Sequence, residues 1–194
     1  MTPPDPKSDL RRYLQLSRDA LLWKLDGLGE YDLRRPLVPT GTNLLGLIKH
    51  VAGVEGGYLG ETFGRPFPEP LPGMEEDAEP NSDMYATLEE SSESIVALYR
   101  RVWAHSDETI ETLELDALGR VPWWPDDRNP VTLHRILLHV IAENNRHAGH
   151  ADLVRELIDG AAGLRSDNGN LPGEDAQWWT SYRDRLESLA RQAG

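Results

Sequence analysis

The longest helical pattern in the chain lies between residues 131 and 160. Its residues recur every three or four positions along one stripe, the spacing of a helix with one buried face. The stripe consists of Ile136, Val140, Glu143, His147, Ala151, Val154 and Ile158. Five of these seven side chains are apolar, so the stripe should face a core made by other helices. This pattern favours a fold built by packing helices together.

Four further stretches carry helical periodicity, at about 8–28, 43–63, 84–113 and 174–190. Thr40 or Thr42 can cap the second of the five, and glycines at 27, 29, 160 and 163 are suited to ending helices. No stretch alternates polar and apolar residues as strands do. We therefore predict an all-α fold: a four-helix bundle with a short extra C-terminal helix, forming a single domain over residues 1–194.

The connections between these helices are rich in proline. Residues 65–80 hold several prolines and many acids, which predicts a partly mobile surface loop. Trp123 and Trp124 stand between prolines, and we expect them to plug one end of the bundle, the alternative being that they wall a pocket. Trp178 and Trp179 are expected to pack the terminal helix against the bundle.

Composition excludes several classes of function. The chain has no cysteine, which rules out disulfides, thiolate metal sites and a cysteine nucleophile. The net charge of −13 disfavours binding to nucleic acid and to anionic membranes. The first residues lack the hydrophobic stretch of a secretory signal, and no apolar run approaches the roughly 20 residues of a membrane span. These features predict a cytoplasmic protein.

Glu143 and His147 interrupt the apolar stripe and lie one helical turn apart. A buried carboxylate needs a partner, because burying it alone costs several kcal/mol. His50 interrupts a similar stripe in the second helix, so packing of the two helices would bring three ligand-type side chains together. Two imidazoles and one carboxylate suit zinc, nickel or another first-row metal. The alternatives are a hydrogen-bonded Glu–His pair without metal, or helices whose faces are turned differently.

Other polar residues are weaker candidates. His139, one turn before Glu143, can orient that carboxylate or be an ordinary flanking histidine. His134 is expected to be exposed, His105 to lie on a polar helix face and Glu55 to be a surface charge. A serine nucleophile is not supported, because no base lies within helical reach of Ser91, Ser92 or Ser94.

Two segments carry a resemblance to a known family. LIKHVAGVEGGYLGETF in the second helix and LLHVIAENNRHAGHADLVRELIDG in the fourth resemble the DinB-like superfamily, in particular its DUF664 branch and mycothiol-dependent enzymes. VPWW and LRSDNGNLPGEDAQWW strengthen the match. The resemblance implies a four-helix bundle, a possible homodimer and a three-ligand metal site at His50, Glu143 and His147. His150 stands where many members have Gln, and the resemblance suggests that it supplements the metal or orients a bound water.

The resemblance also implies a chemistry. A divalent metal, zinc or alternatively nickel, can hold a mycothiol-type thiol as its thiolate for attack on an electrophile, with both reactants being small molecules. Such a thiol transferase needs no catalytic cysteine of its own. The alternatives are a metal-dependent hydrolase, for which His150 and His139 are the only nearby candidate bases on the same helix, and a protein that binds metal without turnover.

Overall fold

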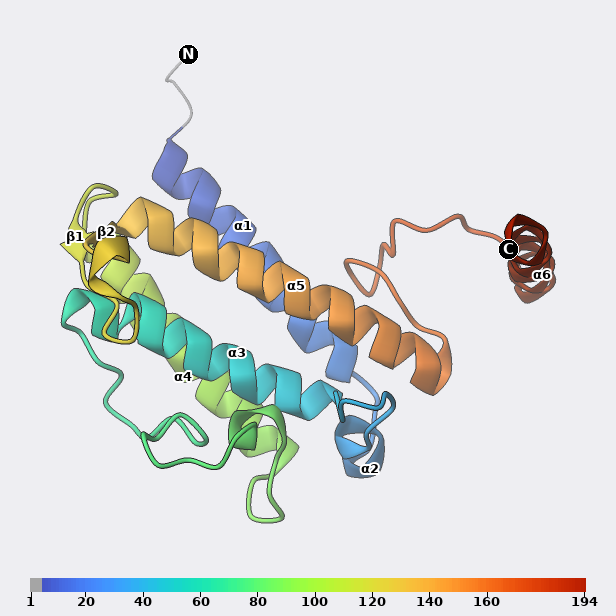
Figure 1. The fold of residues 1–194 in the computed structure, drawn as a ribbon, viewed down its shortest axis with the longest axis horizontal. Helices are drawn as coiled ribbons and strands as arrows, with labels where there is room; N and C mark the ends of the chain where they lie inside the picture. Colours follow the sequence, from blue (N-terminus) through green and yellow to red (C-terminus); the bar gives the residue numbers. More distant parts are fainter. Residues whose placement is uncertain (1–4) are drawn as a thin grey trace.

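The computed structural model describes residues 5–194, so the first four residues of the N-terminal stretch considered for a secretory signal lie outside the described residues. Within these described residues, six α-helices follow one another with short 3-10 helices and two very short strands between them (Figure 1). The elements are α1 (Pro6–Leu22), η1 (Trp23–Leu25), α2 (Glu30–Arg34), α3 (Leu44–Leu59), η2 (Glu61–Phe63), η3 (Ser82–Met84), α4 (Ser92–Thr112), β1 (Leu118–Gly119), η4 (Asp126–Arg128), β2 (Val131–Thr132), α5 (Leu133–Asp159) and α6 (Ala176–Ala193).

The four long helices α1, α3, α4 and α5 form the body of the molecule, which confirms the predicted all-α class. Helix α3 packs against both α4 and α5, and α1 lies along α5 (Figure 1). The buried side chains form two clusters, one around Leu45, Val51 and Tyr99, the other around Leu14, Ile136 and Val140. Helix α3 is therefore covered on two sides, by α4 on one and by α5 on the other.

The helix ends follow local chemistry, with one correction to the sequence prediction. Asn43, and neither Thr40 nor Thr42, caps α3, because its side-chain oxygen accepts a hydrogen bond from the Gly46 amide at 2.8 Å. Gly27 follows η1 with φ +76°, and Gly160 ends α5 with φ +81°. Both conformations favour glycine, so the predicted stops are confirmed there.

The connection between α3 and α4 is longer than predicted. The helix expected over 84–113 begins only at Ser92, where Ser91 provides the N-cap. Residues before it are extended or turned because their backbone groups bond to other parts of the chain; the Met84 carbonyl, for example, accepts from Asn43. We refer below to residues 64–91 as the α3–α4 connection. It lies alongside α3 in Figure 1.

One small departure from the sequence prediction is a pair of very short strands. Leu118 and Gly119 pair with Thr132 and Val131 in a two-residue antiparallel ladder that the sequence did not indicate.

Glu55, predicted as a surface charge, is fully buried. It accepts hydrogen bonds from Arg18 of α1, which also pairs with Asp107 of α4 at 2.9 Å. The prediction was wrong because α4 packs against α3 and the Arg18 side chain of α1 reaches Glu55.

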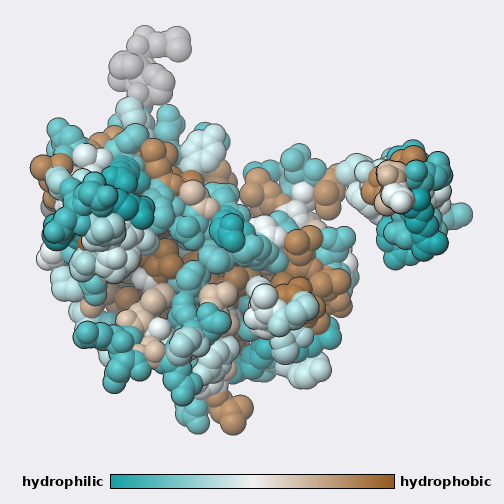
Figure 2. All heavy atoms as spheres, viewed as in Figure 1, coloured by the Kyte–Doolittle hydropathy of each residue, from teal (hydrophilic) through white to brown (hydrophobic). Residues whose placement is uncertain are grey.

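Helix α6 stands apart from the bundle (Figure 1). None of its residues is buried, and Trp178 is 37% exposed. Trp178 stacks on Tyr182 of the same helix at 5.1 Å between ring centres, so the predicted packing of Trp178 and Trp179 against the bundle was wrong. Figure 2 shows hydrophilic residues over most of the visible face of the body. Within residues 5–194, no helix combines the length and the apolar character that crossing a bilayer requires.

Candidate metal centre

His50, Glu143 and His147 come together between α3 and α5. One potential ligand atom from each residue lies within 4.8 Å of the other two. The rings of His50 and His147 are 4.6 Å apart between centres and meet edge to face. His147 is buried, whereas His50 and Glu143 are partly exposed, so the cluster opens towards solvent on one side. The sequence predicted this meeting from two interrupted apolar stripes, and the packing of α3 on α5 brings it about.

The spacing inside the cluster bears on the alternative of a metal-free Glu–His pair. The Nε2 atom of His147 lies 3.6 Å from the Oε2 atom of Glu143, which is too long for a hydrogen bond. Two ligand atoms bound about 2.1 Å from one tetrahedral ion lie roughly 3.4 Å apart. The observed separation therefore fits two ligands around a shared ion better than a bonded pair.

His50 has a partner that sequence reasoning missed. Its Nδ1 atom lies 2.5 Å from the Oδ2 atom of Asp83, which belongs to η3 in the α3–α4 connection. With Nδ1 occupied by this carboxylate, Nε2 is the ring nitrogen left to serve as a ligand. No spacing in the sequence links Asp83 to His50, because the two residues lie on different elements.

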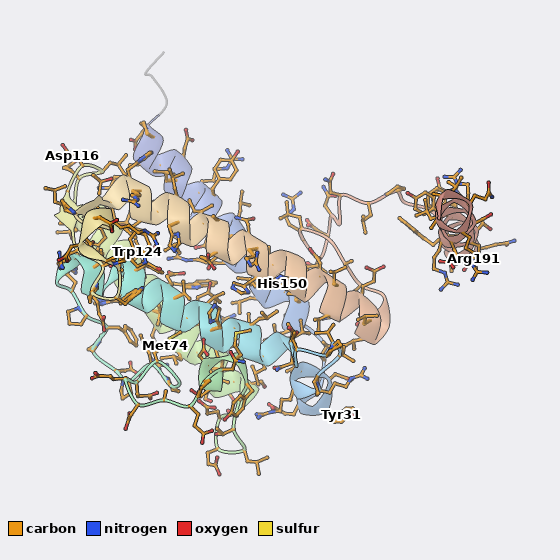
Figure 3. The ribbon with its side chains drawn as sticks, viewed as in Figure 1. Tyr31, Met74, Asp116, Trp124, His150 and Arg191 are labelled. Atoms are coloured by element: carbon orange, nitrogen blue, oxygen red, sulfur yellow. The ribbon has the colours of Figure 1, made fainter. Side chains whose placement is uncertain are left out.

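His147 is arranged in a similar way. Its Nδ1 atom faces the Nδ1 atom of His150 at 3.4 Å, so its Nε2 atom is directed towards Glu143. Burial, followed by the nearby His50 and His150 rings, lowers the pKa of His147 to about 4. The imidazole is therefore neutral near pH 7, the state in which it can bind a metal. His150 lies on α5 in Figure 3.

Tyr58 of α3 and His139 of α5 form an aromatic group together with Trp123 and Trp124. The indole nitrogens of Trp123 and Trp124 both donate to the Tyr58 hydroxyl, at 3.4 and 3.1 Å. His139 packs edge to face on Tyr58 and Trp124, and burial lowers its pKa. Trp124 also packs against the second core cluster, at the end of the bundle labelled in Figure 3. Trp123 is half exposed and lies over Gly57 of α3.

The remaining candidates lie away from this cluster. His134 is exposed, as predicted. His105 is half buried, its Nε2 atom lies 2.7 Å from the Arg65 carbonyl oxygen, and its ring meets Phe67 edge to face. Ser92 donates to Glu30 at the start of α4, where it helps to join α4 to α2.

The geometry has definite chemical possibilities. Two imidazoles and a carboxylate, with their free atoms converging, can hold a divalent ion while leaving coordination positions open for a small molecule. Among the described residues, no side chain beside the three is placed as an evident nucleophile. Chemistry at this site would therefore depend on groups that arrive with the ion or the substrate.

The chain is similar to known proteins in sequence and in fold. The family model described as "Mycothiol-S-transferase" matches residues 9–160, which include all but the first three residues of the α1–α5 bundle and the three converging side chains. A search of curated proteins finds no match. A solved structure of a DinB-like protein from Bacillus cereus ATCC 10987 is similar in fold, with a TM-score of 0.52 and 16% sequence identity over 76% of this chain and 89% of that chain.

Proposed function

Because the chain belongs to the mycothiol S-transferase family, within the DinB-like superfamily, we propose that it is a metal-dependent enzyme that transfers a mycothiol-type thiol to a small electrophilic substrate. The observation that carries the proposal is the convergence of His50, Glu143 and His147 with both histidines oriented through Nδ1. When bound there, a divalent metal supplies a cation that lowers the pKa of a coordinated thiol.

The protein side chains have separate parts in this reaction. His50 and His147 would hold a divalent cation through their Nε2 atoms, and Glu143 would add one negative charge that partly neutralises it. In the proposed transfer, the thiol would release its proton to solvent water, its sulfur would bond to the electrophilic carbon, and the bond from that carbon to the leaving group would break with its electron pair going to the leaving group. The aromatic group around Tyr58 lies further along the same helices, where it can exclude water from the electrophile.

Hydrolysis is the runner-up function. A metal-dependent hydrolase needs a base beside the metal to activate water. His150 faces His147 and His139 is enclosed by aromatic rings, so neither favours that role. Zinc as the native metal, nickel as its alternative, a homodimeric state, a single domain over 1–194 and a cytoplasmic location stay predictions, as does a role for His150 and His139 in supporting the ligands.

Metal affinity and thiol binding test the proposal together. Purified protein is titrated with Co²⁺, and mycothiol is then added while the absorption spectrum is recorded. We expect one ion per chain and a new thiolate-to-cobalt charge-transfer band. His147→Ala should abolish tight binding, whereas the control His134→Ala, on the same helix but exposed, should leave it unchanged.

Each alternative function has its own signature in this experiment. Tight metal binding with no thiolate band, combined with turnover of esters or amides, would establish the hydrolase. Tight binding with neither would establish a metal-binding protein without turnover. Equal, negligible metal affinity in the wild type and in His147→Ala would refute the metal site itself.

A further inference from the structure

Asp83 is the acidic residue that reaches the candidate metal centre from outside the bundle helices. Its Oδ2 atom contacts His50 Nδ1 at 2.5 Å, across a sequence separation of 33 positions. The two side chains are 18% and 21% exposed, so water competes only partly for this contact. Nothing in the proposed reaction requires Asp83 as a ligand, because the three converging atoms belong to other residues.

The backbone around Asp83 is fitted closely to its surroundings. A methyl group on Gly46 of α3 would lie 1.8 Å from the Met84 carbonyl oxygen, directly after Asp83. A methyl group on Gly73 would lie 2.5 Å from the Asp83 amide nitrogen. At both positions only glycine allows this approach without displacing backbone atoms. The segment is therefore held against α3 on one side and against its own earlier turn on the other.

Side chains of α3 fasten the residues that follow. Asn43 donates to the Met84 carbonyl at 3.2 Å. Lys49, the residue before His50, donates to the Tyr85 carbonyl at 3.1 Å and pairs with Glu90 at 2.9 Å. Lys49 is almost fully buried, so these bonds are shielded from water. The carboxylate of Asp83 thus has little freedom to move relative to His50.

From this geometry we propose that Asp83 is a positioning residue for His50. By accepting a hydrogen bond from Nδ1–H, it holds the ring orientation and keeps the Nε2 lone pair directed towards Glu143 and His147. Partners of this kind commonly raise the affinity of a metal-binding histidine by 10–100-fold. The inference rests on the proposed function, since it concerns how one ligand of that site is held.

The competing interpretation is that the Asp83–His50 contact serves only to fasten the α3–α4 connection. Loss of the contact would then lower the stability of the metal-free protein and leave the affinity for metal unaltered. The positioning role predicts that the loss in free energy of metal binding exceeds any loss in free energy of unfolding of the metal-free protein. The two measurements separate the two roles.

The experiment compares three variants of the full chain. Asp83→Ala removes the acceptor, Asp83→Asn keeps an acceptor oxygen but removes the charge, and Asp77→Ala removes a charge from an exposed position in the same connection. Zinc affinity is measured by competition with a chromophoric chelator, the d–d spectrum is recorded with Co²⁺, and thermal unfolding is followed without metal.

We expect zinc affinity to fall about 10–100-fold in Asp83→Ala, less in Asp83→Asn and not at all in Asp77→Ala. The cobalt spectrum should change in Asp83→Ala, because His50 binds in an altered orientation. Wild-type affinity in both Asp83 variants would overturn the inference. If Asp83→Ala does not fold, Asp83→Asn decides, and an unchanged affinity there overturns it.

Failure of the proposed function gives a different result. In that case the wild-type chain itself would bind neither zinc nor cobalt tightly, and all three variants would match it. A wild type that binds tightly, together with Asp83 variants that bind equally well, would refute the role of Asp83 alone.

Discussion

The α3–α4 connection and the C-terminal segment that carries α6 are both long and polar, but they are attached to the bundle very differently. The connection is irregular over most of its length and bonded to α2 and α3 at several points. The C-terminal segment forms a regular helix, yet none of its helical residues is buried. In this molecule, local regularity and attachment to the bundle are separate properties.

The physical difference lies in what the bundle offers each segment. Glycines of α3 let the backbone of the connection approach closely. Polar side chains at α3 donate hydrogen bonds to main-chain carbonyls of the connection. The beginning of the C-terminal segment also finds donors: Lys24 bonds to the Gly163 carbonyl at 2.7 Å and Trp23 to the Leu164 carbonyl at 3.1 Å. The backbone groups of α6 form hydrogen bonds within the helix, so α6 needs no hydrogen-bond donors from the bundle.

The largest effect is expected from loosening the attachment of the α3–α4 connection to α3. Gly46→Ala places a methyl group 1.8 Å from the Met84 carbonyl oxygen, so the backbone must move or the helix must strain. We expect the free energy of unfolding, measured in urea, to fall by about 1–3 kcal/mol. Zinc affinity should fall as well, because the displaced backbone carries Asp83.

The matched control is Gly149→Ala in α5, where an added methyl group meets nothing within 4 Å. Alanine is the better helix former, so this variant should gain up to about 1 kcal/mol. Equal effects of the two substitutions would contradict the close fit described at Gly46.

A second, smaller effect concerns pH. Hydrogen bonds from Ser92 and then from Arg34 lower the pKa of Glu30 to about 2 from an ordinary 4.5, and Arg34 in turn donates to the Thr87 carbonyl at the end of the connection. Because the folded-state pKa lies below the unfolded one, this stabilisation is present above pH 4.5 and is lost as pH falls towards 2.

Comparison of the wild type with Glu30→Gln checks this attachment. The difference in free energy of unfolding should be largest above pH 5 and should shrink as pH falls through 4.5 to 2. A difference that is constant with pH would show that the Glu30 charge does not contribute to holding the connection.

The smallest effect is expected from removing α6. A chain that ends after Gly173 should keep its free energy of unfolding to within about 0.5 kcal/mol and should bind zinc as the full chain does. Limited proteolysis of the full chain should cut between residues 165 and 175 before it cuts the α3–α4 connection. A loss well above 1 kcal/mol on truncation would mean that α6 is covered in solution.

Much of the fold and of the candidate centre was predictable because both depend on helical periodicity. The stripe through Glu143 and His147 predicted which face of α5 is covered, and His50 followed from the same reasoning. Asp83 was not predictable, since its position depends on glycines in α3 that bear no periodic relation to it. Glu55 was misjudged because α3 is covered on two faces, and Trp178 because an amphipathic pattern does not identify what, if anything, covers it.

The converging residues are made at different stages of protein synthesis, because they lie on helices far apart in the chain. His50 and Asp83 leave the ribosome well before Glu143 and His147, which belong to the last helix of the bundle. The imidazole–carboxylate pair can therefore form on the growing chain while only one of the three candidate metal ligands exists. If His50, Glu143 and His147 bind a metal as we propose, the complete ligand set would exist only once α5 has been made and packed on α3.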